Sequence, residues 1–145
     1  MPDVDNGRVQ KLISELREAL SLLNKALERP REAFLSSWRD RLSVRYLIVE
    51  IVEASTSLGI HLLEAEGGKA PETYGEVFNK MAERDIISWE VAEGMKKLVG
   101  LRNLVVHRYW EVDDGRIYDE GRGSGLEVIR RFIEEVEAYL APRRA

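Results

Sequence analysis

The residues best suited to chemistry in this chain lie together, between positions 102 and 109. Arg102 carries a permanent positive charge and can grip a phosphate through two parallel hydrogen bonds. His107 carries an imidazole, which gives and takes protons near pH 7. Such a pair can cut RNA without a metal, because the imidazole helps the 2′-OH attack the adjacent phosphate while the cation stabilises the transition state. Tyr109 can position that phosphate or stack on a base.

Arg102 lies in an apolar stripe of a predicted helix, which is a costly place for a cation. On a wheel of about 100° per residue, it falls in the middle of a face made by apolar side chains. These are Val91, Met95, Leu98, Val99, Val105 and Val106. A buried charge needs a partner, so Arg102 either pairs with an acid or binds a ligand. Glu50 and Glu53, on the polar stripe of an earlier predicted helix, are the available acids. They either support the site, by orienting Arg102 or His107 or as its acidic member, or belong to a stripe that is simply solvated.

The five-residue spacing of Arg102 and His107 leaves their relative placement open. On an ideal helix these side chains point about 140° apart. A bent arginine side chain, a break in the helix near His107, or completion of the site across a two-fold dimer interface would bring them together. The alternative for His107 is a structural interface histidine that is hydrogen-bonded to Asn103.

The charged residues are unevenly distributed. The net charge of −4 argues against broad coating of nucleic acid. Between Lys96 and Tyr109, however, there are four basic side chains and no acid. A local cationic patch that includes Lys96, Lys97 and Arg108 suits contact with a few phosphates of an RNA.

Length and composition favour one globular domain over residues 1–145. The 145 residues are enough to bury a core, and the absence of cysteine excludes disulfides and thiol nucleophiles. Neither histidine stands in a metal-ligand motif, so we expect no metal and no cofactor. The chain has no unbroken apolar run of about 18 residues and no signal-peptide pattern at its N-terminus, so we expect a cytoplasmic protein that does not associate with membranes.

The apolar spacing predicts an all-α fold, an antiparallel up-down bundle of about four long helices plus a short helix. The long helices span about 7–29, 41–66, 88–109 and 124–142, and the short one about 73–84. We further predict a helical connector over 31–39, a cap at Asp40, a tight turn over 113–115 and a flexible loop over 121–125. The 88–109 helix has a second apolar patch at Leu101 and Leu104, so we expect one face to pack in the core and another to meet a partner chain.

The octet from Arg102 to Tyr109 resembles the R-x4-H-x-Y signature of the HEPN superfamily, specifically its branch of HepT-like ribonuclease toxins. The resemblance extends to Val112-Asp113, Glu53-Ala54 and His61-Leu62-Leu63, and it covers roughly residues 44–140. The helix over 7–29 is longer than this matched core requires, and the glycine-rich segment 121–125 looks like an insertion.

The resemblance implies a metal-independent endoribonuclease that works as a homodimer on RNA. Arg102 and His107 would be its catalytic pair, at a cleft by the dimer interface, with Asn103 in support. It also implies a partner, a minimal nucleotidyltransferase antitoxin of the MntA type, which would silence the toxin by adenylylating Tyr109. An added AMP would place negative charge and bulk where the substrate phosphate should lie.

Two other functions are compatible with the same residues. In the first, the domain is a non-catalytic module that holds a nucleotide or completes an assembly with a nucleotidyltransferase. In the second, the bundle is purely structural and Arg102 is a buried ion pair with Glu50 or Glu53.

Overall fold

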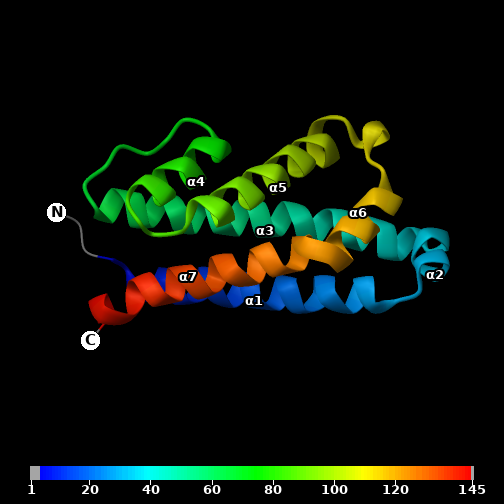
Figure 1. The fold of residues 1–145 in the computed structure, drawn as a ribbon, viewed down its shortest axis with the longest axis horizontal. Helices are drawn as coiled ribbons and strands as arrows, with labels where there is room; N and C mark the ends of the chain where they lie inside the picture. The colour runs from blue at the N-terminus through cyan, green and yellow to red at the C-terminus, as the bar shows by residue number, and fades with distance from the viewer. Residues whose placement is uncertain (1–3, 145) are drawn as a thin grey trace.

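The structure is a computed structural model that describes residues 4–144, with side chains described over 4–142. Over these residues it is an all-α bundle, as predicted, and no strand is present (Figure 1). The four long helices are α1 (Asn6–Glu28), α3 (Trp38–Ala65), α5 (Trp89–His107) and α7 (Leu126–Arg144). The shorter elements are α2 (Arg31–Ser36), α4 (Tyr74–Glu83), η1 (Tyr109–Glu111), α6 (Asp114–Glu120) and η2 (Gly121–Gly125).

Helix α3 is the central helix of the bundle, and α1, α4 and α5 all pack against it. By length and composition alone, α3 is long and apolar enough to cross a membrane, although its apolar residues form no unbroken run of about 18. Of its most apolar stretch of 18 residues, 61% is buried inside the bundle. The apolar surface of α3 is therefore used for packing within the protein, as in the core helix of a globular domain.

Two helices begin at positions that the sequence analysis did not predict, and in both the capping residue explains the difference. Ser37, not Asp40, caps α3, because its hydroxyl accepts a hydrogen bond from the Asp40 N–H at 3.2 Å. The segment 113–115 is no isolated turn, because the Asp113 carboxylate accepts from the Arg116 N–H at 3.0 Å and so starts α6. Aspartate favours turns and N-caps alike, so its presence did not distinguish them.

The predicted flexible loop over 121–125 is instead the π-helical turn η2, which joins α6 to α7 with a kink at Gly123 (φ −86°, ψ −110°). A Cβ atom on Gly121 would lie 2.5 Å from Leu27 Cδ1, so a larger residue there would have to displace the Leu27 side chain of α1. Helix α7 begins at Leu126 and continues through Pro142, which had been expected to stop it.

Candidate functional site

Helix α5 carries most of the candidate residues, and its N-terminus is firmly anchored. The Ser88 hydroxyl caps α5 by accepting from the Val91 N–H at 3.2 Å. The Ser88 N–H in turn donates to Glu135 of α7 at 2.7 Å. Helix α5 ends at His107, so Tyr109 lies beyond it, in η1. The end of α5 therefore changes the direction of the chain at Tyr109. His107 still belongs to the regular helix, and its side chain lies on a different side of α5 from that of Arg102.

Arg102 is held between α3 and α4 by two side chains. Its Nη2 donates to Glu53 Oε1 at 2.9 Å, and its guanidinium lies 4.9 Å from the centre of the Tyr74 ring. At the outer end, Nη1 donates to Asn103 Oδ1 at 3.1 Å. The side chain is 17% exposed, and its buried Nε has no hydrogen-bond partner among the described residues. Of the two acids considered, the structure thus pairs Arg102 with Glu53.

Tyr74 is a neighbour of Arg102 that the sequence analysis missed. Its hydroxyl donates to Glu53 Oε2 at 2.7 Å, so one carboxylate binds both Tyr74 and Arg102. The hydrogen bond to Glu53, together with burial, raises the pKa of the Tyr74 hydroxyl. Tyr74 opens α4 on the apolar side of that helix, where an aromatic residue indicates core packing, and only the fold brings it to Arg102.

Glu50 lies in a different environment from Glu53, although both are on α3. It lines a hollow of about 270 Å³ between α1 and α3, together with Tyr46 and Glu15. Burial raises the pKa of Glu50, and the negative charges of Glu15 and Glu18 raise it further. Glu50 forms no ion pair in the described part of the chain and does not contact Arg102 through a hydrogen bond.

His107 and Tyr109 are both exposed to solvent, and Tyr109 is 63% exposed. Among the described residues no hydrogen bond joins His107 to Arg102. His107 is the last residue of α5. The other histidine, His61, accepts a hydrogen bond at Nε2 from the Asp5 N–H at 2.9 Å.

The backbone that carries Tyr109 is tied to α3 through Arg45. The guanidinium of Arg45 donates to both oxygens of Asp114, at 3.0 and 2.7 Å, and to the Tyr109 carbonyl at 3.4 Å. Arg41 lies 3.7 Å from the same Asp114 carboxylate. These contacts fix the start of α6 and the preceding η1 against the N-terminal half of α3.

The predicted cationic patch is partly neutralised by neighbouring acids. Lys96 pairs with Glu93 at 3.0 Å, and Arg108 pairs with Glu111 at 3.5 Å. Exposed pairs of this kind are weak, so a phosphate can replace the carboxylate. Lys97 is exposed and lines a cleft on another side of α5.

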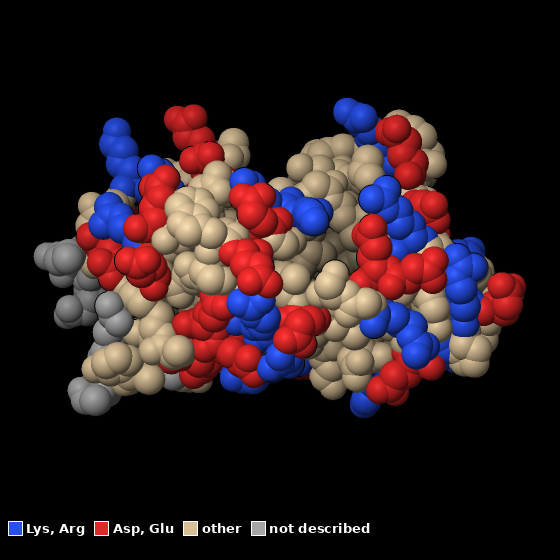
Figure 2. Space-filling model, in the orientation of Figure 1, with Lys and Arg blue, Asp and Glu red and all other residues tan. Residues whose placement is uncertain are grey.

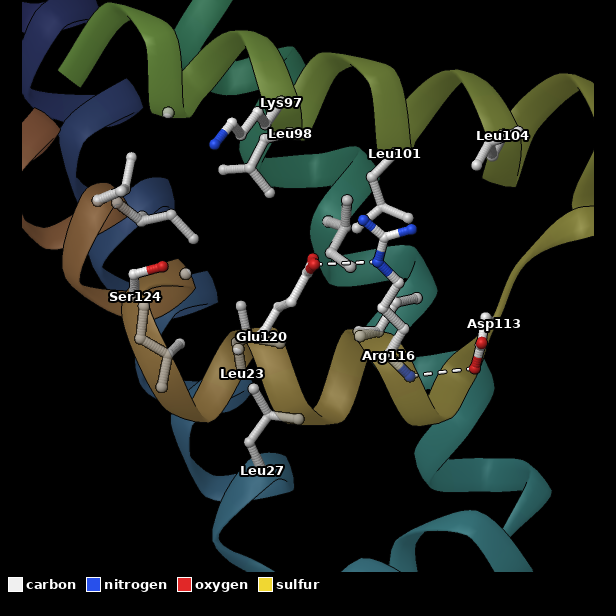
Figure 3. Close-up of a pocket in the computed structure, with 18 of the residues that line it drawn as sticks. Leu23, Leu27, Lys97, Leu98, Leu101, Leu104, Asp113, Arg116, Glu120 and Ser124 are labelled. Carbon is white, nitrogen blue, oxygen red and sulfur yellow. Dashed lines mark hydrogen bonds and ion pairs between the residues drawn. The ribbon is translucent and has the colours of Figure 1, made fainter. Parts of the chain in front are cut away.

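That cleft, about 590 Å³ in volume, separates the C-terminal half of α5 from α6, η2 and α7 (Figure 3). Figure 2 shows the hollow on one face of the molecule, with acidic and basic side chains intermingled around it. Helices α5 and α7 meet at Gly94, where a Cβ atom would lie 2.6 Å from Val128 Cγ1. Beyond this point α5 diverges from α7 (Figure 1). Leu101 and Leu104, the predicted second apolar patch, line the cleft, and Leu101 also packs against the edge of the core.

Comparisons with known proteins place the chain in a family. Residues 16–136 match the family model described as ribonuclease HepT-like. A putative RNase of Archaeoglobus fulgidus is 31% identical over 133 residues, which cover 92% of this chain and 85% of the relative. The tRNA nuclease HepT of Aphanizomenon flos-aquae is 25% identical over 141 residues, 97% of this chain and 95% of the relative.

Solved structures share the fold at low sequence identity. The tri-AMPylated HEPN toxin of Shewanella oneidensis, in complex with MNT antitoxin, superposes with a TM-score of 0.83 at 22% identity, over 92% of this chain and 98% of the toxin. The cytosolic protein YutE of Bacillus subtilis superposes with a TM-score of 0.84 at 17% identity, over 99% of this chain and 95% of that one. The fold is therefore that of the HEPN toxins, and the chain belongs to the HepT-like ribonuclease family.

Proposed function

We propose that this protein is a metal-independent endoribonuclease toxin that cuts RNA with Arg102 and His107. The observation that carries the proposal is the placement of the family motif on α5. Arg102 is presented with its outer nitrogen at the surface, and His107 is exposed at the C-terminus of the same helix. Asn103 holds the outer nitrogen, and Glu53 fixes the inner one.

In the proposed reaction, His107 transfers the proton and Arg102 stabilises the negative charge. His107 takes the proton of the 2′-OH, the 2′-oxygen forms a bond to phosphorus, and the bond from phosphorus to the 5′-oxygen breaks. The proton returns to the departing 5′-oxygen, which leaves a 2′,3′-cyclic phosphate. Arg102 stabilises the extra negative charge on the phosphoryl oxygens. Lys96, Lys97 and Arg108 bind flanking phosphates.

The separation of Arg102 and His107 within one protomer supports a site that a second copy completes. Large apolar side chains are exposed on α3, in the last turn of α5 and in η1, which is unusual for a monomer. They are Leu42 and Tyr46 on α3, Val106 on α5, and Tyr109 and Trp110 in η1. The contact of Arg45 with the Tyr109 carbonyl places these segments next to each other. We assign this surface to a homodimer interface that brings two motifs to one cleft.

The proposed partner is a minimal nucleotidyltransferase antitoxin of the MntA type. The Shewanella oneidensis relative is AMPylated and bound to an MNT antitoxin. In this chain the proposed acceptor is Tyr109, the exposed tyrosine of the motif. Transfer would join the Tyr109 oxygen to the α-phosphorus of ATP and release pyrophosphate. The product adds a phosphate charge and a nucleoside two residues from His107, where substrate must bind.

The test is RNA cleavage by purified protein in the presence of EDTA, with each catalytic variant matched to a control. His107→Ala is expected to lower the cleavage rate by about 10²–10⁴-fold, whereas His61→Ala should leave it near the parent value. Arg102→Ala should lower it by about 10²–10³-fold, whereas Arg130→Ala, on the exposed face of α7, should not. Equal cleavage by His107→Ala and the parent would refute the assignment.

The ion pair between Arg102 and Glu53 favours a second candidate, a non-catalytic helical module. In that case Arg102→Ala and Glu53→Ala would lower stability by similar amounts. Purified parent protein would also bind nucleotide, or assemble with a nucleotidyltransferase, without cutting RNA.

A further inference from the structure

We propose that Tyr74 is a positioning residue that keeps the Arg102 guanidinium available to the substrate phosphate. This inference rests on the proposed function of Arg102. Tyr74 belongs to α4, outside the motif on α5, and it contacts both members of the Arg102–Glu53 pair.

The argument begins with how Glu53 divides its two oxygens. Oε1 accepts from Arg102 Nη2 at 2.9 Å, and Oε2 accepts from the Tyr74 hydroxyl at 2.7 Å. An arginine beside a free carboxylate prefers a forked pair, in which two N–H groups donate to two oxygens. Here the Tyr74 hydroxyl occupies the second oxygen, so Glu53 holds Arg102 through one nitrogen only.

The Tyr74 ring restricts the guanidinium in a second way. Its centre lies 4.9 Å from Arg102 Cζ, which covers one face of the guanidinium by a cation–π contact. With that face covered and Nη2 bound to Glu53, the open part of the group is the Nη1 end. The bond from Nη1 to Asn103 is exposed, so an incoming phosphate oxygen can reach this nitrogen.

The consequence is that removing one oxygen atom from Tyr74 should weaken substrate binding while strengthening an ion pair. In Tyr74→Phe the ring stays, and Glu53 Oε2 is free to accept a second bond from Arg102. The tighter pair then competes with phosphate. We expect the KM for a short RNA to rise by about 5–10-fold, with a smaller change in kcat.

Two further variants separate this effect from a general loss of packing. Tyr74→Phe combined with Glu53→Gln should recover most of the lost affinity, because a neutral amide offers Arg102 a single acceptor oxygen. Tyr118→Phe is the matched control. Tyr118 also lies under an arginine, 5.6 Å from Arg122, and its hydroxyl also donates, to the Arg29 carbonyl at 2.6 Å. Its loss should lower the melting temperature without changing KM.

Binding is measured separately from cleavage by titrating inorganic phosphate and following the Arg102 side chain by NMR. A phosphate Kd that weakens by about 5–10-fold in Tyr74→Phe supports the inference. If the parent cuts RNA and Tyr74→Phe changes neither KM nor Kd, the inference is overturned and the proposed function stands. If the parent cuts no RNA but phosphate binding weakens as expected, the proposed function fails and the positioning role of Tyr74 stands. If the parent neither cuts RNA nor binds phosphate, both are overturned.

Discussion

Two carboxylates three residues apart on α3, Glu50 and Glu53, have opposite surroundings. Glu53 accepts hydrogen bonds from a cation and a hydroxyl. Glu50 is partly desolvated, and the like charges of Glu15 and Glu18 further raise its pKa. Both had been candidates for pairing with Arg102, because both lie on one polar stripe. The stripe can be read from sequence, but which of its members meets Arg102 depends on where α5 crosses α3.

We expect Glu50→Gln to stabilise the protein at neutral pH. Because the pKa of Glu50 is raised in the folded state, its protonated form contributes stability below the ordinary carboxyl pKa, and this contribution is lost as pH rises through the raised pKa. The neutral glutamine avoids that loss. The expected gain is about 0.3–1 kcal/mol at pH 7 and close to zero near pH 3, measured by urea unfolding.

Glu72→Gln is the control for this prediction, since Glu72 is exposed in the segment between α3 and α4. It should change stability little at either pH. A Glu50→Gln variant that is less stable than the parent at pH 7 would contradict the interpretation of Glu50 as an unpaired, partly desolvated charge.

The junction between α5 and α6 depends on one ion pair with α3. Asp114 is bound by Arg45 and lies near Arg41, and its side chain is only 13% exposed. Removing its charge would leave two guanidinium groups without their shared acid. The same contacts hold the carbonyl of Tyr109, so the effect should extend to η1.

We therefore expect Asp114→Asn to cost about 1–3 kcal/mol of stability. Hydrogen–deuterium exchange should also increase over residues 108–113. Asp119→Asn is the matched control, because Asp119 makes an equally bidentate pair with Arg31, at 3.0 and 3.2 Å, but is 58% exposed. An exposed pair of this kind should contribute less than about 1 kcal/mol. Equal losses in the two variants would show that burial of the Asp114 pair is unimportant.

Two glycines of α5 provide a second comparison at the scale of elements. Gly94→Ala would place its new Cβ 2.6 Å from Val128 Cγ1, so α5 and α7 would have to separate, at a cost of about 1–3 kcal/mol. A Cβ on Gly100 meets no atom within 4 Å in the described part of the chain, so Gly100→Ala should stabilise the helix by about 0.5–1 kcal/mol. Thermal unfolding of both variants tests whether α5 and α7 pack closely at Gly94. A Gly94→Ala variant as stable as the parent would contradict this close packing.

Helix existence could be predicted from sequence, whereas several helix ends and joints could not. Apolar spacing is a property of each segment alone, and it located all four long helices. The cap at Ser37, the helical start at Asp113 and the helical form of residues 121–125 depend on local alternatives that are close in energy. Gly121 looked like a loop residue because its close contact with Leu27 is visible only in three dimensions.

At the scale of the whole molecule, the homodimer is the proposal with the most consequences. We expect Leu42→Glu to convert a dimer to a monomer, because it places a charge in the exposed apolar surface of α3. If two motifs share one cleft, the loss of the dimer should also lower RNA cleavage. Leu22→Glu, at an exposed leucine of α1, is the control and should preserve both properties. Sedimentation velocity measures the oligomeric state, and a fully active Leu42→Glu monomer would exclude the shared cleft.

The family could be recognised from the residues 102–109, since Arg102, His107 and Tyr109 recur there at the motif's spacing. The supporting residues were only partly predictable. Glu53 could be named because it lies on the polar stripe of a predicted helix, next to Glu50. Tyr74 and Arg45 belong to helices other than α5, and nothing in the sequence around them indicates a contact with the motif. Long-range neighbours of this kind require the packing of α4 and η1 on α3.

Helix α3 holds both ends of the proposed site, because Glu53 contacts Arg102 and Arg45 contacts the carbonyl of Tyr109. Arg45 and Glu53 are eight residues apart, so their backbones are separated by about 12 Å along one rigid helix. Because α3 is rigid and keeps these two contacts at a fixed separation, a structural change at adenylylated Tyr109 should not be transmitted to Arg102. We expect an adenylylated protein to retain its Arg102–Glu53 bond. The nucleotide would then inhibit the enzyme by blocking substrate access, and its removal would expose a catalytic site whose geometry had not changed.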